Sequence, residues 1–439
     1  MKIGLLAMSG VRVHDRKLLE LGLTLPGFVE RSRIIASLPS LGLLYLAART
    51  PPEHEVLYAE AESGEAVPPE MLGCELVAIS TFSAQIYEAY AVADRLRARG
   101  IMVAMGGLHV SVLPDEALAH ADYVVVGEGE NVWPAVVAAA AAKSGAGVFR
   151  AADFAPVDIN ELPAPRFEVL RNRPYNRYTI QTTRGCPWRC EFCASTVMLQ
   201  SPYRRRPIDG VVRDIEAVER LHPQAFIEFA DDNTFVDKSW GRELCRALIP
   251  LRVHWFTETD LSLADDPGLL DLMQRAGCRQ VLVGLESPTP GPLTGLELRA
   301  DRKAAWAHEH VARVRAIQEQ GITVNACFIL GLDGQTPGVF EDVIDFVETA
   351  QPFDVQITLL TAFPGTPLRA RLARERRLLD PTAWQLCTLF DVNFRPTGMS
   401  PDELRAGIHW LATELYSEEA THRRRRAFFQ RFGRERSLS

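Results

Sequence analysis

Three cysteines, Cys186, Cys190 and Cys193, stand in the spacing CxxxCxxC within one short stretch of the chain. Thiolates are soft ligands that select zinc, copper(I) or iron–sulfur clusters. A four-iron cluster held by only three cysteines keeps one iron open to a further ligand. The three cysteines therefore predict a metal site at which chemistry can take place.

A structural zinc site is the main alternative for these cysteines. Such a site needs a closed tetrahedral shell, commonly two cysteine pairs or a cysteine pair with a histidine pair. The remaining cysteines are widely separated: Cys74, Cys245, Cys278, Cys327 and Cys387. Eight cysteines in 439 residues are also few for a disulfide framework. We therefore expect free thiols and, because the chain opens with Met1-Lys2-Ile3-Gly4 rather than a signal-type segment, a cytoplasmic protein.

The composition is that of an ordinary globular protein, with 47% hydrophobic and 24% charged residues. A length of 439 residues predicts two or three domains. No uncharged apolar run reaches the roughly 18 to 20 residues of a transmembrane helix. A net charge of -8 gives no general attraction to nucleic acid. We expect neither a transmembrane segment nor a nucleic-acid partner.

The three cysteines must be positioned by regular elements, and the first 143 residues alternate between strand-like and helical stretches. Strands are expected near 2–8, 55–61, 76–82, 101–107 and 122–128, with helices near 41–49, 85–99 and 131–143. The strand-like runs are nearly continuous apolar residues, which is typical of strands buried on both faces. The pattern predicts an α/β domain over 1–143 with a doubly wound, Rossmann-like parallel sheet.

The carboxyl ends of three of these strands carry candidate binding residues, because open parallel sheets bind ligands there. These are Ser80 and Thr81, then Gly106 and Gly107, then Glu128. Paired glycines let a backbone approach a large flat ligand closely, and they also serve any tight strand-to-helix turn. The residues alone leave both interpretations open.

A proline-rich connector is expected over 144–177, followed by a second domain over 178–380. Six strand-like runs near 178–183, 226–230, 253–258, 280–285, 322–330 and 355–360 alternate with helical stretches. They predict a partial (β/α)6 barrel whose sites lie at the carboxyl ends of its strands. A helical extension, with a helix near 401–421, is expected over 381–439.

Polar residues and glycine at the predicted barrel strand ends are the next candidates. Asp231 and Asp232 follow the second strand, Glu258 ends the third, Glu286 ends the fourth and Gly331 ends the fifth. Adjacent Asp residues also serve as helix caps and turn residues, and a glutamate at a strand end is often simply solvated. The pattern identifies no catalytic side chain.

The run Thr182-Thr183-Arg184-Gly185-Cys186 through Cys193 resembles the hallmark of the radical S-adenosylmethionine (SAM) superfamily. The resemblance implies that Cys186, Cys190 and Cys193 hold a [4Fe–4S] cluster whose open iron binds the amino and carboxylate groups of SAM. An electron from the reduced cluster then cleaves SAM to a 5′-deoxyadenosyl radical. It further implies that Asp232 and Asp231 lie at the SAM amino group, Glu286 at the ribose and Gly331 near adenine. Related enzymes often have an arginine near the SAM carboxylate; here the third strand end offers Glu258 and no arginine.

The first domain resembles the cobalamin-binding domain fused to many radical SAM enzymes. The likeness rests on the series around Leu41-Gly42, Ser80-Thr81, Gly106-Gly107 and Gly127-Glu128, and it implies that these strand ends bind cobalamin. It departs at one place, because no histidine has Asp two residues before it and the DxHxxG motif for an axial histidine is absent. Cobalt without a protein nitrogen would favour acceptance and release of a methyl group.

These resemblances imply a radical SAM enzyme that methylates an unactivated carbon with cobalamin as a cofactor. One alternative is a cobalamin-independent isomerase, cyclase or group-transfer enzyme with a vestigial cobalamin domain. Another is a non-catalytic iron–sulfur or corrinoid sensor. The expected partners are a small-molecule substrate, such as a lipid or natural-product intermediate, and an electron donor such as flavodoxin or ferredoxin.

Two arginine runs complete the candidates. Arg204, Arg205 and Arg206 could steady an acidic substrate or the SAM carboxylate through charge-assisted hydrogen bonds. The run from Arg423 to Arg426 is expected on a helix, as a solvated face or as a contact to a membrane surface.

Overall fold

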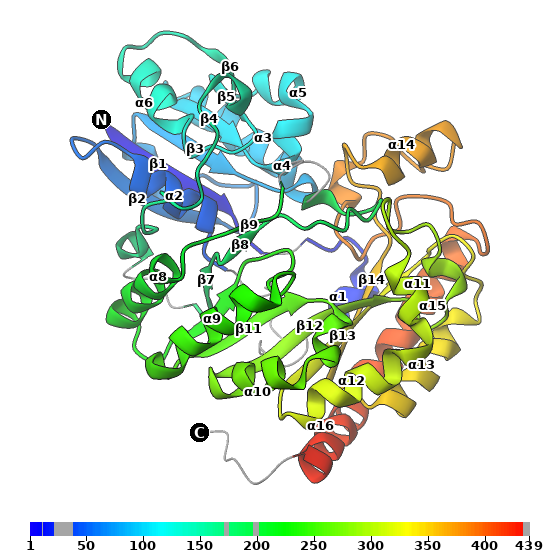
Figure 1. Ribbon diagram of the computed structural model, residues 1–439. Helices are drawn as coiled ribbons and strands as arrows, with labels where there is room; N and C mark the ends of the chain where they lie inside the picture. Colours follow the sequence, from blue (N-terminus) through cyan, green and yellow to red (C-terminus); the bar gives the residue numbers. More distant parts are fainter. Residues whose placement is uncertain (11, 22–37, 171–174, 196–201, 433–439) are drawn as a thin grey trace.

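The computed structural model describes residues 1–10, 12–21, 38–170, 175–195 and 202–432. Two parallel six-stranded sheets dominate it, the first from the N-terminal part of the chain and the second from the central part (Figure 1). The predicted α/β class with two sheet domains and C-terminal helices is confirmed.

The first sheet is doubly wound, as predicted. Its strands run in the order β2-β1-β3-β4-β5-β6, and every pairing is parallel. Their bounds are β1 Lys2–Met8, β2 Glu55–Ala61, β3 Leu76–Ser80, β4 Met102–Gly106, β5 Tyr123–Val126 and β6 Gly147–Arg150. Neighbouring β1 residues enter different cores, Leu5 on one face and Leu6 on the other. Burial on both faces explains why these strands are almost wholly apolar.

Helices cover both faces of the first sheet. They are α2 Leu41–Arg49, α3 Ile86–Arg97, α4 Leu108–Val112, α5 Pro114–Leu118 and α6 Trp133–Ala141. The sheet extends past residue 143, where the sequence analysis ended the domain, because β6 pairs in parallel with β5. The connector therefore starts only after Arg150.

The second sheet runs in the order β7-β10-β11-β12-β13-β14, also entirely parallel. Its bounds are β7 Tyr178–Ile180, β10 Phe226–Phe229, β11 His254–Thr259, β12 Cys278–Glu286, β13 Thr323–Leu330 and β14 Asp354–Leu359. The helices that alternate with them are α8 Ile208–Leu221, α9 Lys238–Leu248, α10 Pro267–Arg275, α12 His310–Glu319 and α13 Val339–Ala350. Sequential strand order with helices outside is the expected partial (β/α)6 barrel.

The C-terminal part ties the two domains together. Trp384 and Cys387 pack into the apolar core of the first domain, although they follow the barrel in sequence. The Tyr87 hydroxyl of α3 donates a hydrogen bond to the Thr382 carbonyl at 2.5 Å. The region after α14 (Pro367–Arg374) therefore contributes to the packing of both sheets.

The single helix expected near 401–421 is two helices, α15 (Pro401–Tyr416) and α16 (Glu418–Phe432). Ser400 and Glu403 form a capping box that starts α15, and Ser417 adopts a non-helical conformation that ends it. In the arginine run on α16, Arg424 is 5% exposed and donates to the Leu415 carbonyl, and Arg425 pairs with the buried Asp354. The expectation of a solvated face is wrong for these two arginines, which anchor α16. No helix among the described residues is long and apolar enough to cross a bilayer.

Candidate active site

The three cysteines lie in a loop that leaves the barrel after β7. A short antiparallel hairpin, β8 (Thr183–Arg184) and β9 (Arg204–Arg205), brackets this loop. Gly185 has a φ of 84°, a left-handed conformation that glycine adopts without strain, and it turns the chain into Cys186. All three cysteines are free and partly exposed.

The arrangement of these thiols fits a cluster better than a single ion. Among the described residues, no three Cys, His, Asp or Glu side chains converge closely enough to hold one metal ion. Burial raises the pKa of Cys186 to about 11 and that of Cys190 to about 12. A thiolate is the form that binds metal, so these thiols need a positively charged group such as iron beside them. Three cysteines on one loop, each free to bind a different iron, suit a [4Fe–4S] cluster.

Asp232 holds both ends of the cysteine loop. Its carboxylate accepts hydrogen bonds from the Gly185 backbone N–H, at 3.0 Å, and from the Ser195 hydroxyl. Gly185 precedes the first cysteine and Ser195 follows the last by two positions. Asp232 also lines the large cleft described below, where a ligand can reach it. Its predicted contact with SAM stays a prediction.

Asp231 differs from its neighbour, because protein donors occupy its carboxylate. It accepts from the backbone N–H groups of Thr182, at 2.8 Å, and Thr183, at 2.9 Å, and from the Thr234 hydroxyl at 2.7 Å. The residue is buried. Asp231 therefore fixes the turn that leads into the cysteine loop, and its geometry offers little to SAM.

Glu286 is held in an unusual backbone conformation at the end of β12. Its φ is 65°, rare for a residue other than glycine, and the pairing of β12 with β13 shifts register at this point. Its carboxylate pairs with the ammonium of Lys303, which also donates to the Gly284 carbonyl at 3.1 Å. Strained residues of this kind cluster at binding sites.

Two cations near the cluster loop were missed by the sequence analysis. Lys303 and Arg302 belong to the short helix α11 (Arg302–Trp306), far along the chain from the third strand end where a cation was sought. The Arg302 guanidinium carbon lies 3.0 Å from the ring centroid of Trp188, which stands between Cys186 and Cys190 in the sequence. One guanidinium nitrogen of Arg302 pairs with Asp260 at 3.6 Å. The sequence signal for these two cations was a Lys/Arg pair after the fourth barrel strand, and no motif distinguished this pair from other charged residues.

Polar side chains occupy the inner face of the barrel. The neighbours of Asn325 on β13, Val324 and Ala326, belong to the main apolar core, so Asn325 points inward by strand alternation. Asn325 is 3% exposed, and its Oδ1 has no hydrogen-bond partner among the described residues. The Oε1 of Gln356 on β14, a half-buried residue, also has no hydrogen-bond partner among the described residues. Barrel interiors are usually filled by branched apolar side chains, so this interior is adapted to bind something polar.

Glu258 is the residue before the last of β11 and lies within this polar interior. Its side chain is accessible to solvent although β11 is a central strand. The side chain faces a hollow that water can enter, but the many protein atoms around it displace bulk water; this desolvation, with the negative charges of Glu228, Asp232 and Asp231, raises the pKa of Glu258 to about 8. No hydrogen bond to its carboxylate is found among the described residues. It is therefore available to a bound molecule, as the sequence analysis expected of a site residue.

Gly331 lies outside the polar barrel interior, at the end of β13. Its φ is 92°, and a Cβ there would come within 2.9 Å of Leu404 and 3.3 Å of Phe394. Its N–H donates to the side chain of Gln335 at 2.7 Å. The glycine serves the packing of α15 against the end of β13, and the structure does not bring it into the cleft.

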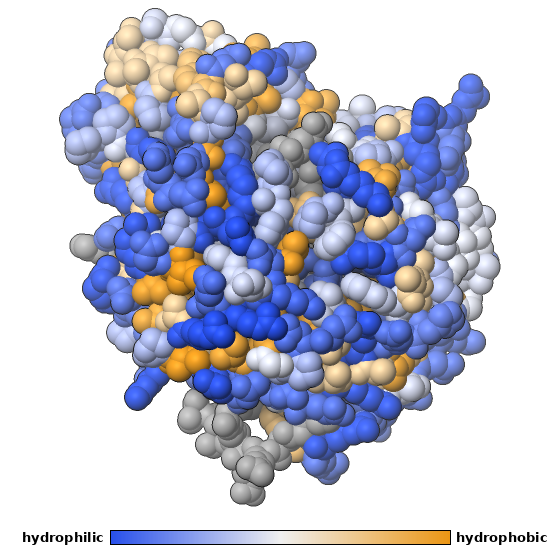
Figure 2. Space-filling model, in the orientation of Figure 1, coloured by the Kyte–Doolittle hydropathy of each residue, from blue (hydrophilic) through white to orange (hydrophobic). Residues whose placement is uncertain are grey.

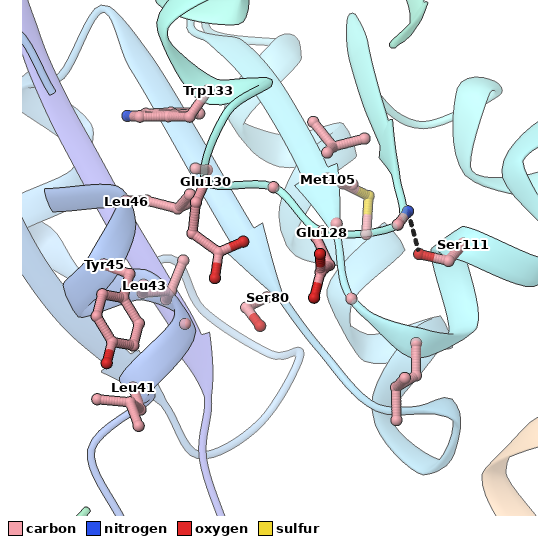
Figure 3. Close-up of a pocket in the computed structure, with 18 of the residues that line it drawn as sticks. Leu41, Leu43, Tyr45, Leu46, Ser80, Met105, Ser111, Glu128, Glu130 and Trp133 are labelled. Carbon is pink, nitrogen blue, oxygen red and sulfur yellow. Dashed lines mark hydrogen bonds between the residues drawn. The ribbon is translucent and has the colours of Figure 1, made fainter. Parts of the chain in front are cut away.

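A cleft of about 1350 Å³, open mouth included, lies between the two domains. One wall is formed by the strand ends of the first sheet, with Ser80, Gly106, Gly107 and Glu128, and by Trp133 (Figure 3). The opposite wall comes from the barrel: Gln181, Arg184, Ser195, Ala230 and Asp232. Ser80, Gly106, Gly107 and Glu128 thus line the cleft, whereas Thr81 is buried and absent from the lining; that they bind a cofactor stays a prediction.

Gly107 must be glycine for this wall to exist. Its φ of 112° and ψ of -178° lie in a region reserved for glycine, and a Cβ would lie 2.8 Å from the Thr81 carbonyl oxygen. Bare backbone here gives a large flat group such as a corrin close access, so the residues present fit cobalamin. No histidine is found among the described lining residues. His109 of α4 is fully buried against Ser83 and Glu116, and His14 lies outside the cleft.

Ion pairs join the two walls. Arg184 donates to Glu128 at 2.8 Å and to Glu130 at 2.6 Å, and Arg204 also pairs with Glu128. Burial opposes ionisation of Glu128, but hydrogen bonds from both arginines outweigh it and lower its pKa. Figure 3 shows the two carboxylates pointing into the cleft from the loop after β5. Glu128 therefore links the domains as well as lining the cleft.

The arginine run on and after β9 is used within the protein. Arg204 pairs with Glu128, Arg205 with Asp237, and the buried Arg206 with the buried Asp214. The expectation that this run steadies a substrate or the SAM carboxylate is not supported by these contacts.

Comparison with known proteins identifies both domains that form the walls of the cleft. Residues 180–347 match the model of the radical SAM superfamily, and residues 36–137 match that of the B12 binding domain. Residues 366–438 match a domain of unknown function.

Relatives and solved structures extend the likeness over most of the chain. Bacteriochlorophyllide d C-12(1)-methyltransferase of Chlorobaculum tepidum is 27% identical, over 88% of this chain and 84% of that protein. An uncharacterized methyltransferase of Synechocystis is 30% identical, over 82% and 67% respectively. The solved structure of the radical SAM methyltransferase TsrM of Kitasatospora setae, with cobalamin and a [4Fe–4S] cluster, aligns with a TM-score of 0.66 at 16% identity, over 96% of this chain and 90% of that chain.

The chain belongs to the cobalamin-binding radical SAM enzymes. Its cofactors are accordingly a [4Fe–4S] cluster, SAM and cobalamin. That the three cysteines, Asp232, Glu286 and the glycine wall hold these groups stays a prediction.

Proposed function

We propose that this enzyme methylates an unactivated carbon of a small molecule in a cobalamin-dependent reaction. One observation carries the proposal: a single cleft has the glycine-rich strand ends of the first domain as one wall and Asp232, which holds the cysteine loop, as part of the other. A methyl carrier on one wall and a radical generator on the other would meet a substrate between them.

The residues of the chain serve this reaction by holding the two walls in place. When bound, the cluster and SAM supply a carbon-centred radical and cobalamin supplies the methyl group. The Arg184 contacts with Glu128 and Glu130 fix the separation of the walls. Asp232 orders the cysteine loop, and Lys303 neutralises Glu286 beside it. The absence of histidine from the described lining suits a cobalamin that passes on its methyl group.

The names of the two curated relatives given above support methylation over the alternatives of isomerase or sensor, while the matches also include anaerobic magnesium-protoporphyrin IX monomethyl ester cyclases at 24–25% identity. Both curated relatives named above are methyltransferases. A cytoplasmic location is also our inference, supported by eight free cysteines.

We further infer that the substrate carries hydrogen-bond donors, such as hydroxyl or amino groups. Asn325 Oδ1 and Gln356 Oε1 in the barrel interior are acceptors without partners among the described residues. Leaving a buried acceptor unpaired costs about 1–3 kcal/mol, so a fully saturated lipid would fit this interior poorly. A polar natural-product intermediate is the better substrate class.

The test uses anaerobically purified enzyme reconstituted with iron, sulfide and cobalamin. It is incubated with a reductant, SAM labelled in its methyl group, and the small-molecule extract of the source cells. We expect bound cobalt and iron, equal amounts of S-adenosylhomocysteine and 5′-deoxyadenosine, and a labelled product in the aqueous phase.

Other outcomes separate the alternatives. 5′-Deoxyadenosine without S-adenosylhomocysteine would overturn methylation and support an isomerase or cyclase. Neither product, with both cofactors bound, would support a sensor. A labelled product found only in a hydrocarbon phase would contradict the polar substrate while leaving methylation intact.

A further inference from the structure

The cysteine loop has a second face, away from the cleft, where two other segments cover it. Cys190 forms an isolated antiparallel bridge with Glu297, and the Leu298 N–H donates to the Arg189 carbonyl at 3.1 Å. On another side, the Leu368 N–H at the start of α14 donates to the Glu191 carbonyl at 3.1 Å. Phe192 packs with Leu296, Leu368 and Leu372 in one small apolar cluster. The loop, the segment before α11 and α14 therefore form one unit.

Four arginines without an acidic partner among the described residues lie on this unit. Arg299, Arg374 and Arg376 are exposed, and Arg189 is half-buried. Most nearby carboxylates have other charged partners: Glu191 pairs with Arg371, Asp333 with Arg371 and Arg377, Glu375 with Arg377, and Glu297 with Arg302. Asp301, two residues after Arg299, is exposed and accepts a hydrogen bond from the Gly295 N–H at 2.7 Å, so the four arginines are offset by one carboxylate. Figure 2 shows strongly hydrophilic residues gathered where Figure 1 places α14, at the upper right. This local excess contrasts with the net charge of -8 of the whole chain.

An apolar residue lies among these arginines. Leu298 is 49% exposed, next to Arg299 and hydrogen-bonded to Arg189. An exposed apolar contact with a charged surround is the usual anatomy of a small protein interface. We call the surface formed by Arg189, Leu298, Arg299, Arg374 and Arg376 the cluster-side patch.

We propose that the cluster-side patch is the docking surface for a small acidic protein that delivers single electrons to the cluster. The cluster must be reduced from outside, and an electron tunnels only over short distances. The cleft face must admit SAM, cobalamin and substrate, so the donor needs another approach. Leu298 and Arg299 of the patch directly follow Glu297, which bridges Cys190, and the helix that carries Arg374 is hydrogen-bonded at its start to Glu191 of the cysteine loop. The donor loses one electron and the cluster gains it, while no bond forms or breaks. Complementary charge suits the small, weak interfaces of electron transfer, because it raises the association rate.

The test measures the rate of cluster reduction by stopped flow, with flavodoxin hydroquinone as the acidic donor probe. The variant Arg299→Glu/Arg374→Glu/Arg376→Glu reverses three charges of the patch. A matched control, Arg99→Glu/Arg220→Glu/Arg246→Glu, makes the same change in net charge at exposed positions after α3 and in the last turns of α8 and α9. Dithionite, which needs no docking surface, reports whether the cluster itself is intact.

At low ionic strength we expect the patch variant to be reduced by flavodoxin about tenfold or more slowly than the control, with unchanged rates for dithionite. The difference should shrink as salt is raised, because the Debye length falls from about 30 Å at 0.01 M to about 3 Å at 1 M. Equal flavodoxin rates for the two triple variants would overturn the proposal. This readout does not involve methyl transfer, so it stands or falls separately from the proposed function.

Discussion

Asp232 accepts a hydrogen bond from the backbone N–H of Gly185, 3.0 Å away, directly before the first cysteine of the CxxxCxxC loop. The same carboxylate accepts from Ser195 beyond the last cysteine. A residue from the second barrel strand end thus sets the position of a loop that follows the first. This contact links the geometry of the barrel to the geometry of the cysteines.

Replacing Asp232 with Asn should loosen the cysteine loop. An amide keeps one acceptor and presents N–H₂ where the second is needed, and hydrogen bonds to a charged group are worth about 1.5–3 kcal/mol. We expect less iron per chain after reconstitution and a weaker effect of SAM on the spectrum of the reduced cluster. Asp266→Asn is the control, because Asp266 caps α10 and pairs with Arg242 far from the loop. Iron content equal in the two variants would contradict the role given to Asp232.

Gly107→Ala should both destabilise the first domain and obstruct the cobalamin wall. The backbone conformation and the 2.8 Å approach to the Thr81 oxygen together should cost about 1–3 kcal/mol. We expect a lower denaturation midpoint and loss of retained cobalamin. Gly100→Ala also places alanine at a positive φ but has open space around its Cβ, so it is the control for a backbone penalty without the contact to the Thr81 oxygen. If both variants retain cobalamin like the wild type, the glycine wall does not bind it.

Lys303→Met should be strongly destabilising, because it leaves the carboxylate of Glu286 buried without its partner. Removing one member of a buried pair costs about 3–5 kcal/mol. The double variant Lys303→Met/Glu286→Gln should regain part of this loss in chemical denaturation. Lys2→Met, which breaks a largely exposed pair with Glu55, should cost under about 1 kcal/mol. A double variant less stable than Lys303→Met would show that the two residues do not act as a pair.

Glu258→Gln should change how stability depends on pH. The native protein keeps a proton on Glu258 up to about pH 8, whereas the unfolded chain releases it near its ordinary pKa of about 4.3. Between these values the native state binds more protons than the unfolded state, so stability falls as pH rises. Glutamine cannot ionise, so the free energy of unfolding of the variant, relative to that of the wild type, should increase from about pH 5 to about pH 8. Above about pH 8 the difference should stay constant. Water inside the barrel screens part of this effect. Parallel stability curves for the two proteins would reject the raised pKa.

Local patterns were enough to predict the elements and the cysteine site. Nearly continuous apolar strands alternating with helices indicated two parallel sheets, and the expected strands are found with ends shifted by only a few residues. Strand β6 was missed because its four residues, Gly147–Arg150, are only partly buried or exposed and lack an apolar run. The break at Ser417 was missed because both flanking segments have helical composition.

The chain itself determined which residue types were available: three cysteines in the spacing of an open cluster, and glycines at the first domain's strand ends. Only the tertiary structure decided which polar residues meet them. It directed Asp231 to the backbone and Asp232 to both ends of the cysteine loop, and it brought Lys303 and Arg302 from a helix remote in sequence. It also joined Glu128 to Arg184 across the cleft. The physical reason is that spacing along the chain fixes only local neighbours, whereas charge pairing and close packing select partners by their distance in space.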